Sequence, residues 1–203
     1  NKCLESIPKH PSISELIVVD NGSEKGFVER TMAIREDVTV ISSERNIGYG
    51  AAINIAAQGI SGEYLLVLNQ DVVFQNDTLT ELLLSLRQNR NISIWGVQLQ
   101  NSNGEEQGST GPFPTISTWI SRLFKPKPER KYYSIRPKAG SKIDWTTGAF
   151  MAIGHSAFKD LKGFDEGYFM YYEDVDLCKR ASNAGHFTAL SSATATHSAP
   201  IAE

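Results

Sequence analysis

Short apolar runs rich in β-branched residues alternate with helix-like segments through the first hundred residues of the chain. The apolar runs lie at residues 16–19, 38–41, 64–68 and 92–97. Helical patterns fill the intervals, notably at residues 51–58 and 79–86. A regular alternation of strands and helices favours a parallel sheet whose strands are joined by right-handed crossovers. We therefore predict one α/β domain rather than two.

The size and composition of the chain exclude several other classes. With 203 residues, of which 40% are hydrophobic, it can bury one sizeable core without disulfides. Its longest uninterrupted apolar run, residues 64–68, is far shorter than the roughly 20 residues that span a bilayer. The net charge of −3 gives no reason to expect a nucleic-acid partner. Cys3 and Cys178 have no metal-type spacing and indicate free thiols in a reducing cytoplasm.

The second half of the sequence is less regular. Its expected elements are a polar glycine-rich loop, a strand-like stretch, a helix and a last strand, at residues 101–111, 143–153, 175–184 and 187–190. The segment from Arg122 to Lys138 holds seven of the 20 basic residues and three prolines, which exclude a regular helix there. We interpret this segment either as a solvated loop or as a flap attracted to a lipid diphosphate or an anionic membrane surface.

Polar residues follow the predicted strands at the positions where open α/β sheets bind ligands, beyond the carboxyl ends of the strands. The first run is followed by Asp20 and Asn21, and the third by Asn69, Gln70 and Asp71. If the strand continues, Asn69 and Asp71 project to one face, since they are two residues apart. Amide and carboxylate oxygens suit Mg²⁺ or Mn²⁺ bridging phosphates. The alternative is an ordinary strand-end turn, in which Asn and Asp are common.

A glycine-containing loop precedes the helix predicted at residues 51–58. Gly48 and Gly50 at such a place can bind phosphate at the helix N-terminus. A dinucleotide-binding motif would need a third glycine or alanine where this chain has Ile53. The alternative is that the two glycines serve close packing between the loop and its helix.

Three carboxylates lie within four residues directly before the helix predicted at residues 175–184. They are Glu173, Asp174 and Asp176, preceded by the aromatic residues Tyr168, Phe169, Tyr171 and Tyr172. One carboxylate of such a group can act as a general base while its neighbours orient it. The alternative is that the acids favour the positive end of the helix dipole, which is our interpretation of Asp176. The aromatic residues suit either a core or a platform for a sugar.

The order of these motifs resembles glycosyltransferase family 2, which has the GT-A fold, and within it the rhamnosyltransferases that build bacterial surface polysaccharide. The similarity covers residues 2–198 and rests on motifs that begin at Asp20, Asn46, Leu68, Trp145, Gly163 and Glu173. The resemblance implies a Rossmann-like, mostly parallel sheet flanked by helices, with a smaller mixed-sheet half on the acceptor side. It implies one domain over residues 1–203, with the donor bound by residues 1–100 and catalysis in residues 101–203.

The resemblance also implies roles for individual residues. The nucleotide-sugar would be bound by Asp20, Asn21, Asn46, Gly48, Asn54, Asn69 and Gln70. The pocket for sugar and acceptor would be bordered by Trp145, Thr147 and Gly148. The divalent cation, Mg²⁺ or Mn²⁺, would be held by Asp71 and His197. The base that deprotonates the acceptor hydroxyl would be Asp174, with Glu173 beside it as the next candidate.

By the same resemblance, the reaction would be an inverting transfer of rhamnose from dTDP-rhamnose to a glycan or lipid-linked saccharide. The enzyme would work in the cytoplasm, with peripheral contact at the inner face of the plasma membrane. Two other classes compete with this hypothesis. One is a non-catalytic relative that binds nucleotide or glycan, and the other is a nucleotidyltransferase, whose glycine-rich and basic phosphate loop we do not find near the first strand.

The sequence departs from the family pattern in two places. Members of the family usually open with a hydrophobic strand, whereas residues 1–7 resemble the helix that follows it. We therefore expect that a native first strand precedes this sequence. Asn69 also stands where the family has the first Asp of a D-x-D motif, so the cation would be bound by fewer charges.

Overall fold

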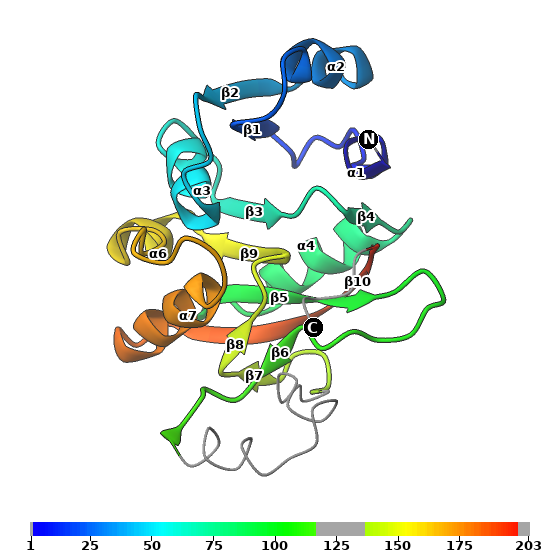
Figure 1. The fold of residues 1–203 in the computed structure, drawn as a ribbon. Coiled ribbons are helices and arrows are strands. Elements are labelled where there is room, and N and C mark those ends of the chain that lie inside the picture. The colour runs from blue at the N-terminus through cyan, green and yellow to red at the C-terminus, as the bar shows by residue number, and fades with distance from the viewer. Residues whose placement is uncertain (1, 117–136, 199–203) are drawn as a thin grey trace.

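A mixed sheet of six strands forms the centre of this computed structural model, which describes residues 2–116 and 137–198 (Figure 1). The strand order is β3-β9-β5-β10-β4, and β7 pairs with β10 beside this path. The bounds are Tyr64–Leu68 for β3, Val72–Phe74 for β4, Ile92–Gln100 for β5, Lys142–Ile143 for β7, Phe150–Gly154 for β9 and Phe187–His197 for β10. The two longest strands, β5 and β10, are parallel neighbours in the middle of the sheet.

A separate sheet of two strands lies near the N-terminus. Its strands β1 and β2 are parallel and are joined by the crossover helix α2. Arg35 follows α2, and its buried guanidinium donates hydrogen bonds to the carbonyls of Leu4 and Ile7, which ties α1 to this crossover. The bounds are Lys2–Ser6 for α1, Ile17–Asn21 for β1, Phe27–Ile34 for α2 and Thr39–Ser43 for β2.

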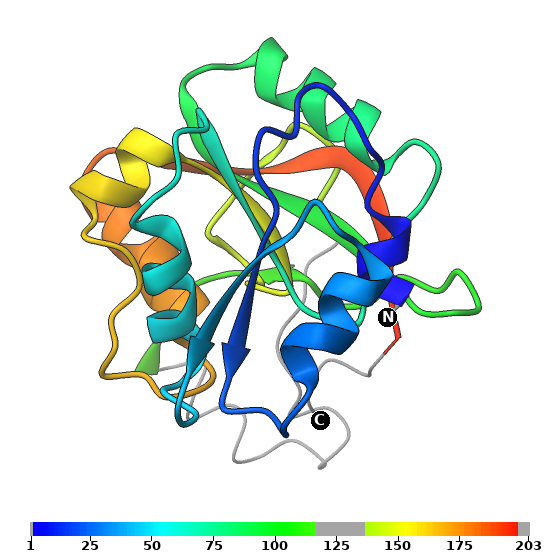
Figure 2. The ribbon, with the colours of Figure 1, turned by 90° about the horizontal axis from the view of Figure 1, so that it is seen from above.

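Helices cover both faces of the six-stranded sheet (Figure 2). One buried cluster joins α4 and α1 to the sheet, and the other joins α3, α6 and α7. Consecutive residues of β3 alternate between the two clusters, with Leu65 and Val67 in one and Leu66 packed on the other, as the two-residue period of a strand requires. The bounds are Tyr49–Ala57 for α3, Thr78–Gln88 for α4, His155–Asp160 for α6 and Glu173–Asn183 for α7.

The expectation of a mostly parallel sheet is wrong. Among the described strands, only the pairs β1–β2 and β5–β10 are parallel. Strand β9 lies antiparallel between β3 and β5, and β4 and β7 are antiparallel to β10. A parallel pair of strands needs a crossover connection, usually a helix. Residues 101–149 connect β5 to β9, and β9 runs in the direction opposite to β5. The mixed sheet expected only in the second half therefore includes strands of the first half.

The predicted helices and strands of the first hundred residues are confirmed within a few residues, whereas β4, α6 and β6 (Thr110–Gly111) were not predicted. The strand-like stretch predicted at residues 143–153 divides into the end of β7, β8 (Trp145–Thr146) and β9, and β8 pairs with β6. The last strand, predicted at residues 187–190, continues to His197. Its second part consists of Ser, Thr and Ala, which carry little hydrophobic signal, so only tertiary pairing with β5 and β4 identifies it as a strand.

A cavity of about 860 Å³ separates the two sheets. Consecutive residues of β1 and β3 line it, so the backbone edges of both strands face it, and side chains of α1, α3 and α4 surround it. In the described part of the chain, β1 has β2 as its single strand partner and β3 has β9. Asn21, Asn69, Gln70 and Asp71, which directly end or follow these strands, also line the cavity.

Candidate active site

At the end of β1, Asp20 shapes a tight turn. Its carboxylate Oδ1 accepts a hydrogen bond of 2.8 Å from the backbone N–H of Ser23, and Oδ2 accepts one of 3.4 Å from the Ser42 hydroxyl. The turn needs Gly22, which has φ 81° and whose Cβ would lie 2.6 Å from the Asn46 nitrogen. The hydrogen bonds from Ser23 lower the pKa of Asp20. The carboxylate is therefore ionised at neutral pH.

The next residue, Asn21, fastens β1 to the loop before α3. Its amide nitrogen donates to Asn46 Oδ1 at 3.0 Å and to the Gly48 carbonyl at 3.2 Å. Its oxygen accepts a hydrogen bond of 2.9 Å from the N–H of Ile47, and Asn46 Oδ1 also accepts from the N–H of Gly48. The side chains of Asn21 and Asn46 thus hold the loop that begins α3, where Gly48 has φ 95°.

At the end of β3 the chain turns instead of continuing. The strand ends at Leu68, and the N–H of Val72 donates to the carbonyl of Asn69, so residues 69–71 form a turn into β4. The two-residue spacing therefore does not place Asn69 and Asp71 on one strand face. Strand β4 pairs with the end of β10, where Val72 lies opposite His197. This pairing brings together Asp71 and His197, which are 126 positions apart.

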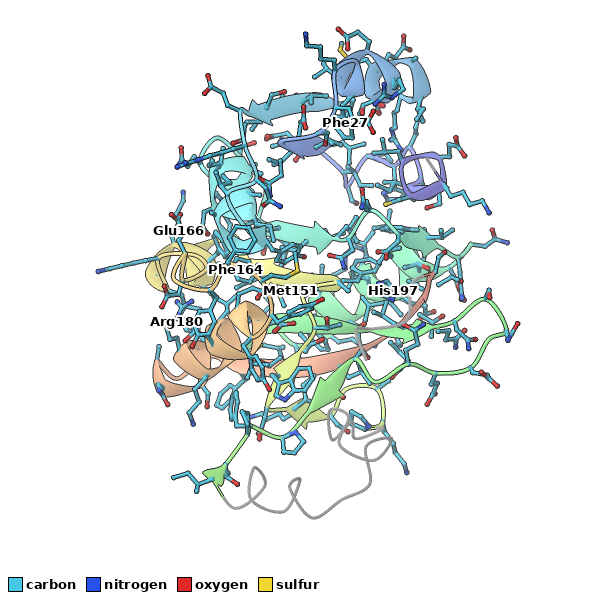
Figure 3. The ribbon with its side chains drawn as sticks, in the orientation of Figure 1. Phe27, Met151, Phe164, Glu166, Arg180 and His197 are labelled. Carbon is cyan, nitrogen blue, oxygen red and sulfur yellow. The ribbon has the colours of Figure 1, made fainter. Side chains whose placement is uncertain are left out.

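Two metal-ligand atoms of this pair meet without any hydrogen-bond partner. Asp71 Oδ1 and His197 Nε2 lie 3.3 Å apart, both buried and both unpartnered (His197 is labelled in Figure 3). Around a cation bound at 2.0–2.1 Å, adjacent ligands of an octahedron are about 3 Å apart, so the pair fits Mg²⁺ or Mn²⁺. The described residues contain no group of three or more His, Cys, Asp or Glu placed to hold a metal. The described residues thus offer two candidate ligands, which matches the Mg²⁺ pattern of few carboxylates completed by substrate phosphate and water.

Asp174, in the first turn of α7, is held by two backbone N–H groups. Gly148 donates to Oδ2 at 2.9 Å, and Val175 donates to Oδ1 at 2.8 Å. The preceding Tyr171 and Tyr172 are both left-handed, with φ 70° and 69°, which turns the chain sharply into the helix. Burial raises the pKa of Asp174, while the hydrogen bonds from Gly148 and Val175 oppose that rise. A raised pKa suits a carboxylate that must accept a proton near neutral pH.

The neighbouring Glu173 is more deeply buried, with 6% of its surface exposed. Its Oε2 has no hydrogen-bond partner. Burial raises the pKa of this carboxyl, and the charge of Asp174 raises it further. Because Asp174 is only partly buried, it is the better placed of the two to meet an acceptor arriving from solvent.

Tyr49 supports the residue that binds Asp174. Its hydroxyl donates a hydrogen bond of 2.7 Å to the carbonyl of Gly148, the residue whose N–H binds Asp174. A Cβ on Gly148 would lie 3.1 Å from the Tyr49 ring, so a larger residue there would displace the ring by a few tenths of an ångström. Burial and then the charges of Asp174, Glu173 and Asp71 raise the pKa of Tyr49 well above its usual value. The Tyr49 hydroxyl thus supports Gly148, which in turn binds Asp174, although sequence reasoning did not single it out.

The family model described as Glycosyl transferase family 2 matches residues 1–161. The chain belongs to glycosyl transferase family 2. The rhamnosyltransferase WbbL of Escherichia coli K12 is 32% identical over 151 residues, which are 68% of this chain and 55% of that protein. The N-acetylglucosaminyl-diphospho-decaprenol L-rhamnosyltransferase of Mycobacterium tuberculosis is 29% identical over 196 residues, covering 84% of this chain and 61% of that protein. The chain thus spans between half and two thirds of these relatives.

The fold is that of GT-A glycosyltransferases, as expected. The crystal structure of GalNAc-T7 with UDP, GalNAc and Mn²⁺ superposes with a TM-score of 0.67 at 16% identity, over 94% of this chain and 38% of that one. The mixed sheet flanked by helices agrees with this architecture. The sequence-based assignment to the family and to the fold is therefore confirmed.

Asn54 and Trp145, which have roles expected from the family pattern, both make structural hydrogen bonds. Asn54 uses its whole amide on the turn before α7: it donates to the Phe164 carbonyl and to Glu166, and accepts from the N–H of Phe164 (Figure 3 labels Phe164 and Glu166). It is not among the residues that line the cavity. Trp145 is a core residue, 5% exposed, whose indole N–H donates to the Pro112 carbonyl. Both residues thus have structural contacts, and their expected places in the donor pocket and the sugar pocket stay predictions.

The remaining predicted residues can be placed more briefly. Thr147 lies beside Asp174 and hydrogen-bonds to it. Asp176 forms an ion pair of 2.7 Å with Arg180, which also donates to the Leu161 and Gly163 carbonyls, so Asp176 has a structural role.

The basic segment from Arg122 lies outside the described residues except for positions 137 and 138, and its membrane contact stays a prediction. No helix in the described ranges is long and apolar enough to cross a membrane.

Proposed function

We propose that this chain forms the donor-binding and catalytic core of an inverting glycosyltransferase that uses a nucleotide-sugar. The observation that carries the proposal is the pair of buried polar atoms on Asp71 and His197 that lie 3.3 Å apart without a hydrogen-bond partner. A cation site and a carboxylate of raised pKa are the two parts that this reaction needs. Asp71 lies between β3 and β4, His197 ends β10, and Asp174 lies in the first turn of α7.

Rhamnose, carried by dTDP, is the donor sugar that we propose. The support is that WbbL and the mycobacterial relative both bear the name rhamnosyltransferase. The acceptor in our proposal is the hydroxyl of a glycan or a lipid-linked saccharide, since the mycobacterial name includes a diphospho-decaprenol saccharide. Asp20 and the loop fastened by Asn21, Asn46 and Gly48 would bind the nucleotide, with Asn69 and Gln70 beside the diphosphate.

In the proposed reaction, Asp174 accepts the proton of the acceptor hydroxyl. The acceptor oxygen then forms a bond to the anomeric carbon from the face opposite the leaving group, and the bond from that carbon to the phosphate oxygen breaks. The nucleoside diphosphate leaves with the electron pair, and the anomeric configuration is inverted. A bound Mg²⁺ or Mn²⁺ would supply positive charge against the diphosphate. Gly148 and Thr147 hold the Asp174 carboxylate beside the proposed sugar pocket.

The decisive experiment is a thermal-shift screen of nucleotide-sugars with and without Mn²⁺. A ligand that binds only the folded chain raises its melting temperature. We expect the largest rise with dTDP-rhamnose together with Mn²⁺, followed by release of dTDP when a saccharide acceptor is added. The absence of any response to every nucleotide would refute the donor site. Binding without turnover would instead favour the non-catalytic alternative.

A further inference from the structure

The side chain of Gln107 contacts His197 on the side of the ring away from Asp71. Gln107 lies in the polar loop between β5 and β6, and its amide nitrogen donates to the His197 carbonyl at 3.2 Å. Its amide oxygen lies 2.9 Å from Nδ1 of the same residue. The opposite ring nitrogen, Nε2, is the buried atom that faces Asp71. One amide therefore contacts both the backbone and the ring of His197.

The orientation of the Gln107 amide follows from what each partner can do. A backbone carbonyl can only accept a hydrogen bond, so the NH₂ end of the amide must face the His197 carbonyl. The amide oxygen then faces the ring, and it too can only accept. Nδ1 must therefore carry the hydrogen. In a neutral imidazole the other nitrogen is then bare, so a lone pair of Nε2 points toward Asp71 Oδ1.

This arrangement explains why the two buried atoms lack partners. In the neutral ring, the lone pair on Nε2 and the carboxylate oxygen 3.3 Å away are both acceptors, so no hydrogen bond joins them in that form. A cation between them would satisfy both. The backbone of Gln107 is also held in place. The N–H of Gln107 donates to the Leu99 carbonyl, and the carbonyl of Gln107 accepts from the side-chain amide of Gln98.

We infer that Gln107 is a positioning residue that fixes the Nδ1–H tautomer of His197, so that bare Nε2 is presented beside Asp71 as a cation ligand. The inference rests on the divalent-cation site of the proposed function. It goes beyond that function because it assigns a task to a loop residue that touches neither donor nor acceptor in our proposal. Groups that orient a ligating histidine through its second nitrogen tune metal affinity.

The first test reads the tautomer directly, without metal or substrate. Long-range ¹H–¹⁵N spectra of the labelled protein at a pH of about 8 distinguish the two neutral tautomers of each histidine. His197→Gln identifies the signal among the four histidines. We expect the Nδ1–H form in the wild type and a mixture in Gln107→Met. An Nε2–H form or a fully protonated ring in the wild type would overturn the inference, and this result does not depend on whether Gln107→Met folds.

The second test measures Mn²⁺ affinity in the presence of dTDP. Gln107→Met should weaken binding by about 10-fold or more, whereas Gln107→Glu, which keeps an acceptor for Nδ1–H, should stay closer to the wild type. Gln98→Met is the matched control, since it makes the same change at a residue that holds the loop but does not touch the ring. An equal loss in Gln98→Met would show that loop support alone matters and would overturn the inference. If the wild type binds no Mn²⁺, the cation site of the proposed function fails, while the tautomer spectra still decide what Gln107 does to the ring.

Discussion

The two sheets of this protein carry different parts of the candidate site and are supported very differently. The β1–β2 pair holds Asp20 and Asn21, whereas the six-stranded sheet and its helices hold Asp71, His197 and Asp174. Strands β5, β9 and β10 each have strand neighbours on both sides, while β1 has one described neighbour and faces the cavity with its other edge. The groups proposed for metal binding and proton transfer are thus built on the better supported region.

The cavity beside β1 is a space between two strand edges. Two open strand edges and apolar helix surfaces face a single space of about 860 Å³. Unpaired backbone groups beside apolar side chains are a template for another strand. In the described part of the chain, these edges of β1 and β3 are therefore open to pairing with a further strand.

The largest effect should come from the well-supported side of the comparison. Asp174→Asn removes the proposed base while keeping the size of the side chain, so we expect kcat to fall by about 10²–10⁴-fold with nearly unchanged donor affinity. Steady-state kinetics and donor titration check this. Asp176→Asn is the control, because it makes the same change two residues along in an ion pair with Arg180. A near wild-type kcat in Asp174→Asn would move the base elsewhere, first to Glu173.

Amide hydrogen exchange should separate the two sheets next. Alternate N–H groups of β1 point away from β2 toward the cavity edge, whereas those of β9 lie between β3 and β5. We expect the β9 amides to exchange at least about 100-fold more slowly than those of β1, since central strands open only with large cooperative units. Equal protection in both strands would mean that the free edge of β1 is already covered.

Asn21→Ala tests whether the N-terminal sheet serves donor binding. The change leaves the N–H of Ile47 without its side-chain acceptor and removes one of two donors from Asn46 Oδ1 and from the Gly48 carbonyl, at about 1 kcal/mol of stability. We expect a raised KM for the nucleotide-sugar with little change in kcat. The exposed Asn76→Ala should change neither. A fall in kcat alone would place Asn21 with the catalytic groups and break the division between the two sheets.

The smallest effect concerns pH and the buried acid Glu173. The pKa of Glu173 is raised by burial and by the charge of Asp174. In the pH window between the pKa of Glu173 in the unfolded chain and its higher pKa in the folded chain, the folded chain keeps a proton that the unfolded chain has lost. Stability therefore falls as the pH rises through the window, and Glu173→Gln removes that loss. We expect the variant to exceed the wild type by about 1 kcal/mol, or about 2–4 °C, near pH 8 and to match it near pH 4. Exposed Glu63→Gln should show no such difference, and an equal gain at both pH values would contradict the burial argument.

Local patterns in the sequence predicted most elements because strand and helix periodicities are local properties. They did not predict strand directions, since the antiparallel entry of β9 depends on a long connection rather than on any residue pattern. The pairing of Asp71 with His197 came only from the family resemblance, because 126 positions separate them. The expected place of Trp145 at the sugar pocket stays a prediction, because an indole that bonds to Pro112 in the core has the same sequence signal as one that meets a sugar. Gln107 gave no signal at all in a loop of polar residues.

The grip of Asn54 on the turn at Phe164 has a consequence for engineering. The resemblance divides the chain into donor and acceptor halves near residue 100, yet this residue of the first half holds the segment that leads into α7. Gly163 must also be glycine there, since a Cβ would lie 2.3 Å from Asn54 Oδ1. Chimeras that join the first half of one family member to the second half of another would inherit a mismatched joint at this position. A chimera should therefore take Asn54, Gly163 and Phe164 from the same parent protein.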